Sequence, residues 1–134
     1  MANETIGGLG FHHIGLKVAD LAKSKSMYEA LGMKEVCSWG EGDSEIVMLD
    51  LGDGGRLELF AGGGDFLSTE GKWLHFAMKV NDVDAAYQTA LAAGFVSKTA
   101  PKIVPLQSRP TSISINIAFV VGPDGEELEF FRQL

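Results

Sequence analysis

Apolar and polar residues alternate in two short stretches, one near the start of each half of the chain, at 14–18 and 76–80. This period of two is typical of a β-strand with one buried face. An Asp follows each stretch, and then comes an amphipathic segment ending in Gly, at 21–32 in the first half and 83–94 in the second. An Asp before such a segment and a Gly at its end predict a capped helix. Each half is therefore expected to open with a strand and a helix.

Three strand-like runs follow each predicted helix. Those of the first half are separated by turns rich in Gly and Asp, and they lie at 33–39, 44–51 and 56–61. Those of the second half lie at 95–99, 112–121 and 126–131, with a longer, Pro-bearing loop expected at 100–110. Each half thus has the order strand-helix-strand-strand-strand, a βαβββ module.

The two halves also repeat one another in sequence. A shift of 62 residues places His13 on His75 and Lys17 on Lys79, and the Asp and Gly residues that flank the two predicted helices coincide as well. A repeat of two units indicates paired modules rather than a solenoid, which needs at least about three units to be stable. A ferredoxin-like sandwich has too few strands to account for three runs after each helix.

Composition bounds the class of protein. A chain of 134 residues suits one domain, which we expect to span 1–134, with module 1 at about 11–61 and module 2 at about 73–133. The net charge of -7 repels phosphate backbones and acidic membranes, so neither nucleic acid nor a membrane is an expected partner. The single Cys excludes an intrachain disulfide and a thiolate metal cluster. Since the chain has no targeting pattern and no long apolar run, a cytoplasmic location is expected.

Alternation places a His and a Glu of each half on the sheet face that points away from the helices. His13 and Glu58 share this face in the first half, and His75 and Glu129 share it in the second. Bulky aromatic residues also lie there, which favours a cavity over an open solvated surface. Two imidazoles and two carboxylates suit a divalent transition metal, and on an octahedral ion they leave two positions for water or substrate.

Four segments in this order, "FHHIGLKVAD", "RLELF", "WLHFAMKVND" and "IAFVVGPDGEELEFF", resemble the vicinal oxygen chelate superfamily. This superfamily groups glyoxalase I, bleomycin-resistance proteins and dioxygenases. The resemblance covers nearly the whole chain and implies an α+β fold of two tandem βαβββ modules, with a curved mixed sheet around a metal-containing cavity. It implies one divalent ion, Ni, Zn, Co or Mn, held by His13, Glu58, His75 and Glu129. It also implies a homodimer, with the metal site built within one chain or across two.

The set of His, Glu, His and Glu is most similar to that of glyoxalase I, which converts the glutathione hemithioacetal of methylglyoxal into S-lactoylglutathione. The resemblance therefore implies a metal-dependent lyase or isomerase that abstracts a proton next to a carbonyl and stabilises an enediolate. Either Glu129 or Glu58 can be the catalytic base. Dioxygenases of the superfamily use two His and one Glu, so Glu58 argues against oxygen chemistry. An acyl-CoA epimerase and a non-catalytic binding or resistance protein are the alternatives on the same fold.

Substrate recognition departs from the glyoxalase I pattern. Lys17 stands where glyoxalase I has an Arg that binds a glutathione carboxylate, and Gly62 stands where it has an Asn. These departures argue against specificity for glutathione as a cosubstrate, whereas a small anionic substrate is still expected. The residues expected to bind substrate are Lys17, Phe60, Trp73 and Arg109. Arg56 is a further candidate for contact with an anion. For Arg56 and Arg109, however, a solvated surface position is the default expectation. For Phe60 and Trp73, the default is core packing.

Overall fold

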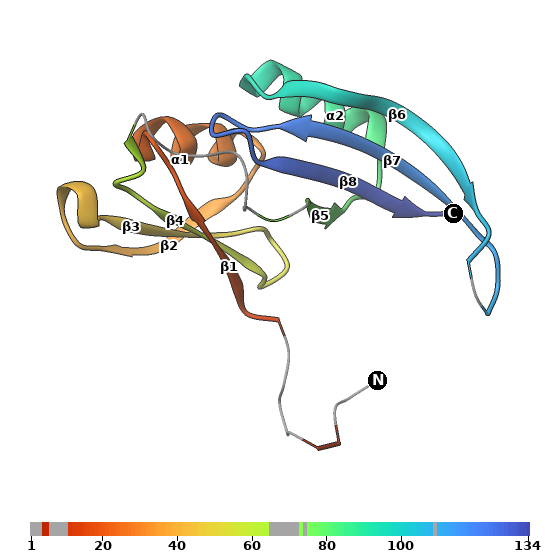
Figure 1. Ribbon diagram of the computed structural model, residues 1–134, viewed down its shortest axis with the longest axis horizontal. Helices are drawn as coiled ribbons and strands as arrows, with labels where there is room; N and C mark the ends of the chain where they lie inside the picture. Colours follow the sequence, from red (N-terminus) through yellow and green to blue (C-terminus); the bar gives the residue numbers. More distant parts are fainter. Residues whose placement is uncertain (1–3, 6–10, 65–72, 74, 109) are drawn as a thin grey trace.

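The computed structural model describes residues 4–5, 11–64, 73, 75–108 and 110–134, and these form two βαβββ modules (Figure 1). Module 1 consists of β1 (His13–Lys17), α1 (Leu21–Ala30), β2 (Lys34–Trp39), a short 3-10 helix (Gly42–Ser44), β3 (Ile46–Asp50) and β4 (Arg56–Phe60). Module 2 consists of β5 (Phe76–Lys79), α2 (Val83–Ala93), β6 (Val96–Leu106), β7 (Ile113–Val121) and β8 (Glu127–Gln133). The α+β fold predicted from the sequence is confirmed.

The eight strands form two four-stranded mixed sheets rather than one continuous sheet. Their orders are β1-β4-β3-β2 and β5-β8-β7-β6, so the first strand of each module lies at the edge of its sheet. Each edge strand pairs in parallel with the last strand of its own module, and the other pairs are antiparallel. Among the described strands, β1 and β5 therefore each have one edge without a partner.

The helix ends follow the sequence closely. Asp20 and Asp82 are the N-caps of α1 and α2, and their carboxylates accept hydrogen bonds from the backbone N–H groups three residues later. Gly94 is the left-handed C-cap of α2, at a φ of 102°. The α1 helix differs, because its C-cap is Leu31 in a right-handed conformation and Gly32 follows it.

One segment that was predicted to be a loop is a strand. β6 continues through Pro101 and Pro105 to Leu106 and pairs with β7 along this length. Proline has no N–H to donate, but β6 is an edge strand, where one side of the backbone needs no partner. Shifts in the register between Ser97 and Lys102 accommodate the irregular backbone. The two prolines therefore mark a sheet edge here and not a loop.

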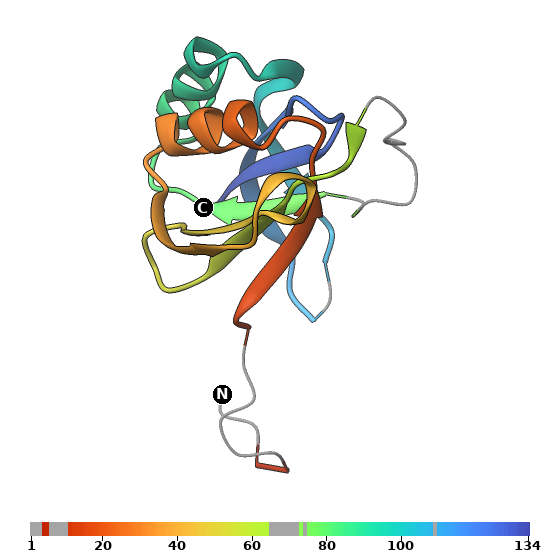
Figure 2. The same ribbon diagram turned by 90° about the vertical axis from the view of Figure 1, so that its left-hand side faces the viewer.

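A single hydrophobic core joins the two modules. Buried leucines of module 1, including Leu57 and Leu59, belong to the same cluster as Leu128 and Val120 of module 2. The α1 and α2 helices contact one another and lie side by side above the sheets (Figure 2). Because the helix-facing side of each sheet is used for this packing, the opposite faces are left for the candidate site. No helix in the described part of the chain is long and apolar enough to span a bilayer.

A buried polar contact also links the modules. The Tyr28 hydroxyl on α1 donates to Glu126 Oε1 at 2.7 Å, and Glu126 Oε2 accepts from the Asp124 N–H at 2.9 Å. Asp124 in turn accepts from the backbone N–H of Ala19 at 2.9 Å. Both Tyr28 and Glu126 are almost fully buried, and burial raises the pKa of each side chain. This contact, which we name the inter-module clasp, ties α1 to the β7–β8 turn.

Candidate metal centre

The first candidate pair lies on β1 and β4. His13 Nε2 is 3.0 Å from Glu58 Oε2. The parallel register of the two strands causes this proximity, because it places His13 beside Arg56 and Gly15 beside Glu58 on one face of the sheet. The glutamate is nearly buried, at 9% of its side-chain surface, whereas the imidazole is 43% exposed. A buried carboxylate thus lies below an open imidazole.

The second pair reproduces this geometry in module 2. His75 Nε2 is 3.1 Å from Glu129 Oε2, and the side-chain exposures are 38% and 9%. The His75 ring makes an edge-on contact with Phe119, with ring centroids 5.4 Å apart. Burial raises the pKa of the Glu129 carboxyl, and the neighbouring His75 opposes that shift. The internal repeat of the sequence therefore extends to the spacing of the side-chain atoms.

The geometry of each His–Glu pair fits two ligands of one metal ion. Two ligands bound at about 2.1 Å and at right angles to one another lie about 3.0 Å apart, which matches both nitrogen–oxygen distances. Imidazole nitrogen with carboxylate oxygen is also a donor set that suits Ni, Zn, Co or Mn. Among the described residues, however, no group of three or more His, Cys, Asp or Glu side chains is close enough to hold one ion. Within one chain the four predicted ligands therefore form two separate pairs.

His12 lies next to the first pair. Strand alternation would place it on the helix side of the sheet, but it is exposed, and its Nδ1 lies 2.9 Å from Nδ1 of His13. Alternation misplaces His12 because it precedes the start of β1 and is not bound by the pleat of the strand. The contact occupies the His13 ring nitrogen that does not face Glu58, so it can orient the imidazole and fix its tautomer. This hydrogen-bond partner could not be predicted from the sequence pattern.

Phe60 and Lys17 share the face of the first pair. They are neighbours across the parallel β1–β4 register, and the Phe60 ring lies over Gly15, where an added Cβ would be only 3.0 Å from Phe60 Cε2. The Lys17 ammonium lies beside Gly62, and a Cβ on Gly62 would come within 2.6 Å of the Asp43 carbonyl oxygen. Gly62 also has a φ of +87°. An Asn at this position would therefore be strained, which explains the departure from the glyoxalase I pattern.

Of the other two predicted substrate residues, Trp73 alone is among the described residues. Trp73 packs against the hydrophobic core, and its indole N–H donates to the Glu127 carbonyl at 2.8 Å. This matches the core-packing role that is the default for such a residue. Arg109 lies outside the described residues.

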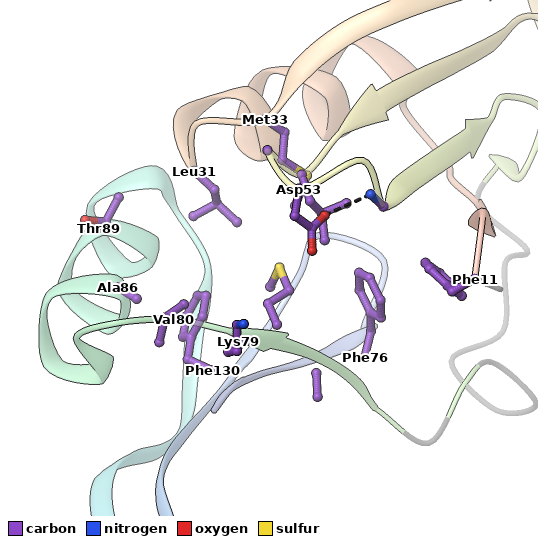
Figure 3. Close-up of a pocket in the computed structure, with 15 residues that line it drawn as sticks. Phe11, Leu31, Met33, Asp53, Phe76, Lys79, Val80, Ala86, Thr89 and Phe130 are labelled. Carbon is purple, nitrogen blue, oxygen red and sulfur yellow. Dashed lines mark hydrogen bonds between the residues drawn. The ribbon is translucent and has the colours of Figure 1, made fainter. Parts of the chain in front are cut away.

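A cavity of about 700 Å³ lies beside β5, between the two modules (Figure 3). Phe76, Met78 and Phe130 of module 2 line it, together with Leu31 and Met33 of module 1. None of the four candidate ligands lines it. This cavity could not be predicted from the sequence, because it forms where the modules meet and residue periodicity reports only local structure.

Comparison with known proteins identifies the family. The family model described as the glyoxalase/bleomycin resistance protein/dioxygenase superfamily matches residues 10–130. The chain belongs to this superfamily. It is 31% identical over 126 residues to the uncharacterized protein YwbC of Bacillus subtilis (strain 168), covering 90% of this chain and 95% of YwbC.

Solved structures of the superfamily have the same fold. TnmS3, an antibiotic binding protein from Streptomyces sp. CB03234, superposes with a TM-score of 0.74 at 18% identity over 96% of this chain and 99% of its own. A glyoxalase I variant from Zea mays superposes with a TM-score of 0.68 at 25% identity over 90% of this chain and 43% of its own. The fold thus occurs both in an enzyme and in a binding protein.

Proposed function

We propose that this superfamily member is a metal-dependent lyase or isomerase of glyoxalase I type that works as a homodimer. In this proposal, His13 and Glu58 of one protomer and His75 and Glu129 of a second copy hold one divalent metal ion. The observation that carries it is the presence of two matched pairs, each with the spacing of adjacent metal ligands and each incomplete alone. In a two-fold dimer the same contact occurs twice, so the dimer has two such sites.

The sheet edges support this assembly. β1 and β5 are edge strands, and each lies next to the strand that carries the glutamate of its pair. If β1 of one copy lies beside β5 of another, the His–Glu faces of both sheets are brought to a common centre. The pairing would also cover two backbone edges that are open in the single chain.

The residues of the chain supply the proton chemistry. When bound, the metal ion polarises the substrate oxygens and stabilises the negative charge of an enediolate. Glu58 or Glu129 removes the proton from the carbon next to the carbonyl and returns it to the neighbouring carbon. Both carboxylates are nearly buried. For Glu129, burial raises the pKa of the carboxyl group, which makes its carboxylate a stronger base. In this proposal, His13 and His75 are metal ligands that do not transfer protons, and His12 orients the His13 ring.

The expected assay result is metal-dependent turnover of the methylglyoxal–glutathione hemithioacetal. Purified protein loaded in turn with Ni, Zn, Co or Mn should form S-lactoylglutathione, which is measured by its thioester absorbance, and chelation of the metal should stop the reaction. Exchange of the substrate C–H proton with deuterated solvent would reveal proton abstraction from other carbonyl compounds, including acyl-CoA thioesters. No turnover and no exchange with any of the four metals would reject the enzymatic function.

The second candidate function is small-molecule binding without conversion. The cavity of about 700 Å³ favours it, because its size is typical of ligand sites, its lining is largely apolar, and none of the candidate ligands lines it. A pure binder would retain an apolar compound in this cavity, and its affinity would be indifferent to metal and to Glu58→Gln. Ligand binding with and without chelator separates the two functions.

A further inference from the structure

Arg56 carries a buried donor that nothing in the described part of the chain satisfies. Its Nε is inaccessible to solvent and has no hydrogen-bond partner among the described residues. Its Nη1 contacts the Met48 sulfur, at 3.7 Å, and thioether sulfur is a weak acceptor. Among the described residues, the ion pairs that form do not include this guanidinium. Because the buried Nε–H has no acceptor among these residues, its burial costs folding free energy.

The position of Arg56 places this cation next to the first candidate pair. It lies beside His13 in the parallel register and two residues before Glu58 on the same face of β4. Side chains two residues apart on a strand are separated by roughly 7 Å. The guanidinium leans towards Met48, which is the β3 partner of Glu58. A molecule bound at the metal pair could thus reach Arg56 with a group only a few atoms away.

Two carboxylates that neighbour Arg56 in the sheet are engaged elsewhere. Asp50 is the β3 partner of Arg56, but its Oδ1 accepts the N–H groups of Gly52 and Gly54 in the β3–β4 turn, at 2.6 and 3.4 Å. The Glu58 carboxylate is directed to His13. In the described part of the chain the guanidinium thus has no ion-pair partner, and an anion from a bound molecule can take this place.

The corresponding site in module 2 shows the contrast. Glu127 stands two residues before Glu129, as Arg56 stands before Glu58, and its carboxylate is paired with the Lys98 ammonium. The charge at this position is thus paired within module 2, whereas in module 1 it has no ion-pair partner among the described residues. Internal symmetry therefore does not account for Arg56.

We propose that Arg56 binds a carboxylate of the substrate held at the His13–Glu58 pair and so selects acidic substrates. The proposal rests on the proposed function for the identity of the reacting group. A carboxylate is the class of group that fits, because the planar guanidinium offers parallel N–H donors that match two carboxylate oxygens. Lys17 lies at the other end of the β1–β4 register, so the His13–Glu58 pair has a cationic residue on each side. Of these two residues, Lys17 is exposed and Arg56 is half-buried.

Two matched substrates test the selectivity. The methylglyoxal hemithioacetals of 3-mercaptopropionate and of 2-mercaptoethanol differ in one terminal group, a carboxylate in the first and a hydroxyl in the second. Arg56→Gln should lower kcat/KM for the acidic adduct by roughly 10- to 100-fold and that for the neutral adduct by less than about 3-fold. Arg56→Lys should retain part of the preference. Arg132→Gln, which removes an exposed arginine near the end of β8, should change neither. Equal losses for both adducts, or no loss for either, would overturn the proposal.

A second readout does not depend on turnover. In metal-free protein labelled with nitrogen-15, the Arg56 Nε–H resonance should shift when 3-(methylthio)propionate is added and stay in place with the corresponding amide. The Arg132 resonance should not respond to either compound. If wild-type protein turns over neither adduct but the Arg56 resonance shifts, the proposed function fails and Arg56 remains an anion site. If the Arg56 resonance does not respond and both adducts are turned over at equal rates, the anion site is refuted while the proposed enzymatic function stands.

Stability distinguishes this role from a structural one. Arg56→Met preserves the apolar stem and removes donors that have no partner, so the melting temperature of the free protein should not fall. A fall of several degrees, or dissociation of a dimer by Arg56→Gln with the acid preference intact, would show that Arg56 holds the fold or a second copy and would refute the substrate role.

Discussion

Replacing His75 by Ala is expected to abolish tight metal binding and to lower metal-dependent turnover by on the order of 10³-fold. The change removes one of four proposed ligands and leaves the buried Glu129 carboxylate without the imidazole that lies 3.1 Å away. Metal content after dialysis, measured by mass spectrometry, gives the binding result, and kcat/KM with the added metal gives the catalytic one. His13→Ala should have an effect of the same size, because His13 has the matching position in module 1.

His12 provides a graded control for this prediction. It contacts the far nitrogen of His13 and is not a proposed ligand, so His12→Ala should weaken metal binding by only about 10- to 100-fold. The three variants all lose one imidazole, so a general effect of removing histidine would affect them alike. Metal retention by His75→Ala at the wild-type level would contradict the proposed ligand set.

Tyr28→Phe should lower the free energy of unfolding by about 1.5–3 kcal/mol at pH 7, because it removes a buried hydrogen bond to a carboxylate. Burial raises the pKa of Glu126, so in the folded protein this group takes up its proton at a higher pH than in the unfolded chain. Its own contribution to stability is therefore present below the unfolded pKa and is lost as the pH rises through the folded pKa. Below the folded pKa the acceptor is neutral, and the cost of Tyr28→Phe should shrink to about 1 kcal/mol.

Tyr87→Phe is the matched control. The Tyr87 hydroxyl donates to the neutral Ser97 hydroxyl at 2.6 Å, so its removal should cost about 1 kcal/mol at every pH. Urea unfolding of both variants at pH 7, and at a series of lower pH values, gives the comparison. A cost for Tyr28→Phe at pH 7 that is no larger than that for Tyr87→Phe would show that the inter-module clasp does not hold a charged carboxylate.

Local patterns predicted most of the elements and one face of each sheet. The parity of His13 with Glu58, and of His75 with Glu129, follows from strand alternation alone, and the structure brings both pairs within hydrogen-bond distance. The N-cap carboxylates of both helices are likewise local features, set by the first turn. Such features could be predicted because they depend on neighbours a few residues away.

Contacts between distant segments were not predicted. Glu126 belongs to a stretch that reads only as a turn and a strand start, yet it is buried against Tyr28, 98 positions away. The prolines of β6 were misread, because only the strand order shows that they lie on an edge. For the same reason the sequence could not show that the two His–Glu pairs remain apart within the chain, since this depends on how the modules pack.

The packing of the modules explains why a second copy is needed for the proposed site. The shared core and the clasp use the helix sides of the sheets, and among the described residues the two His–Glu pairs do not come together around one point. In the proposed site, each module would thus provide half of the ligand set.

Subunit complementation is the most direct test of this account. His13→Ala and His75→Ala proteins are mixed in equal amounts after mild unfolding and refolding, and metal content and turnover are measured. Half of the dimers would then be mixed, and each mixed dimer would contain one intact site, so about a quarter of the wild-type metal binding and activity should return. A mixture of His13→Ala with Glu58→Gln, which are both in module 1, should recover nothing. If the first mixture also stays at the level of its inactive parents while mixed dimers form, the two pairs do not meet across protomers and the proposed metal site is wrong.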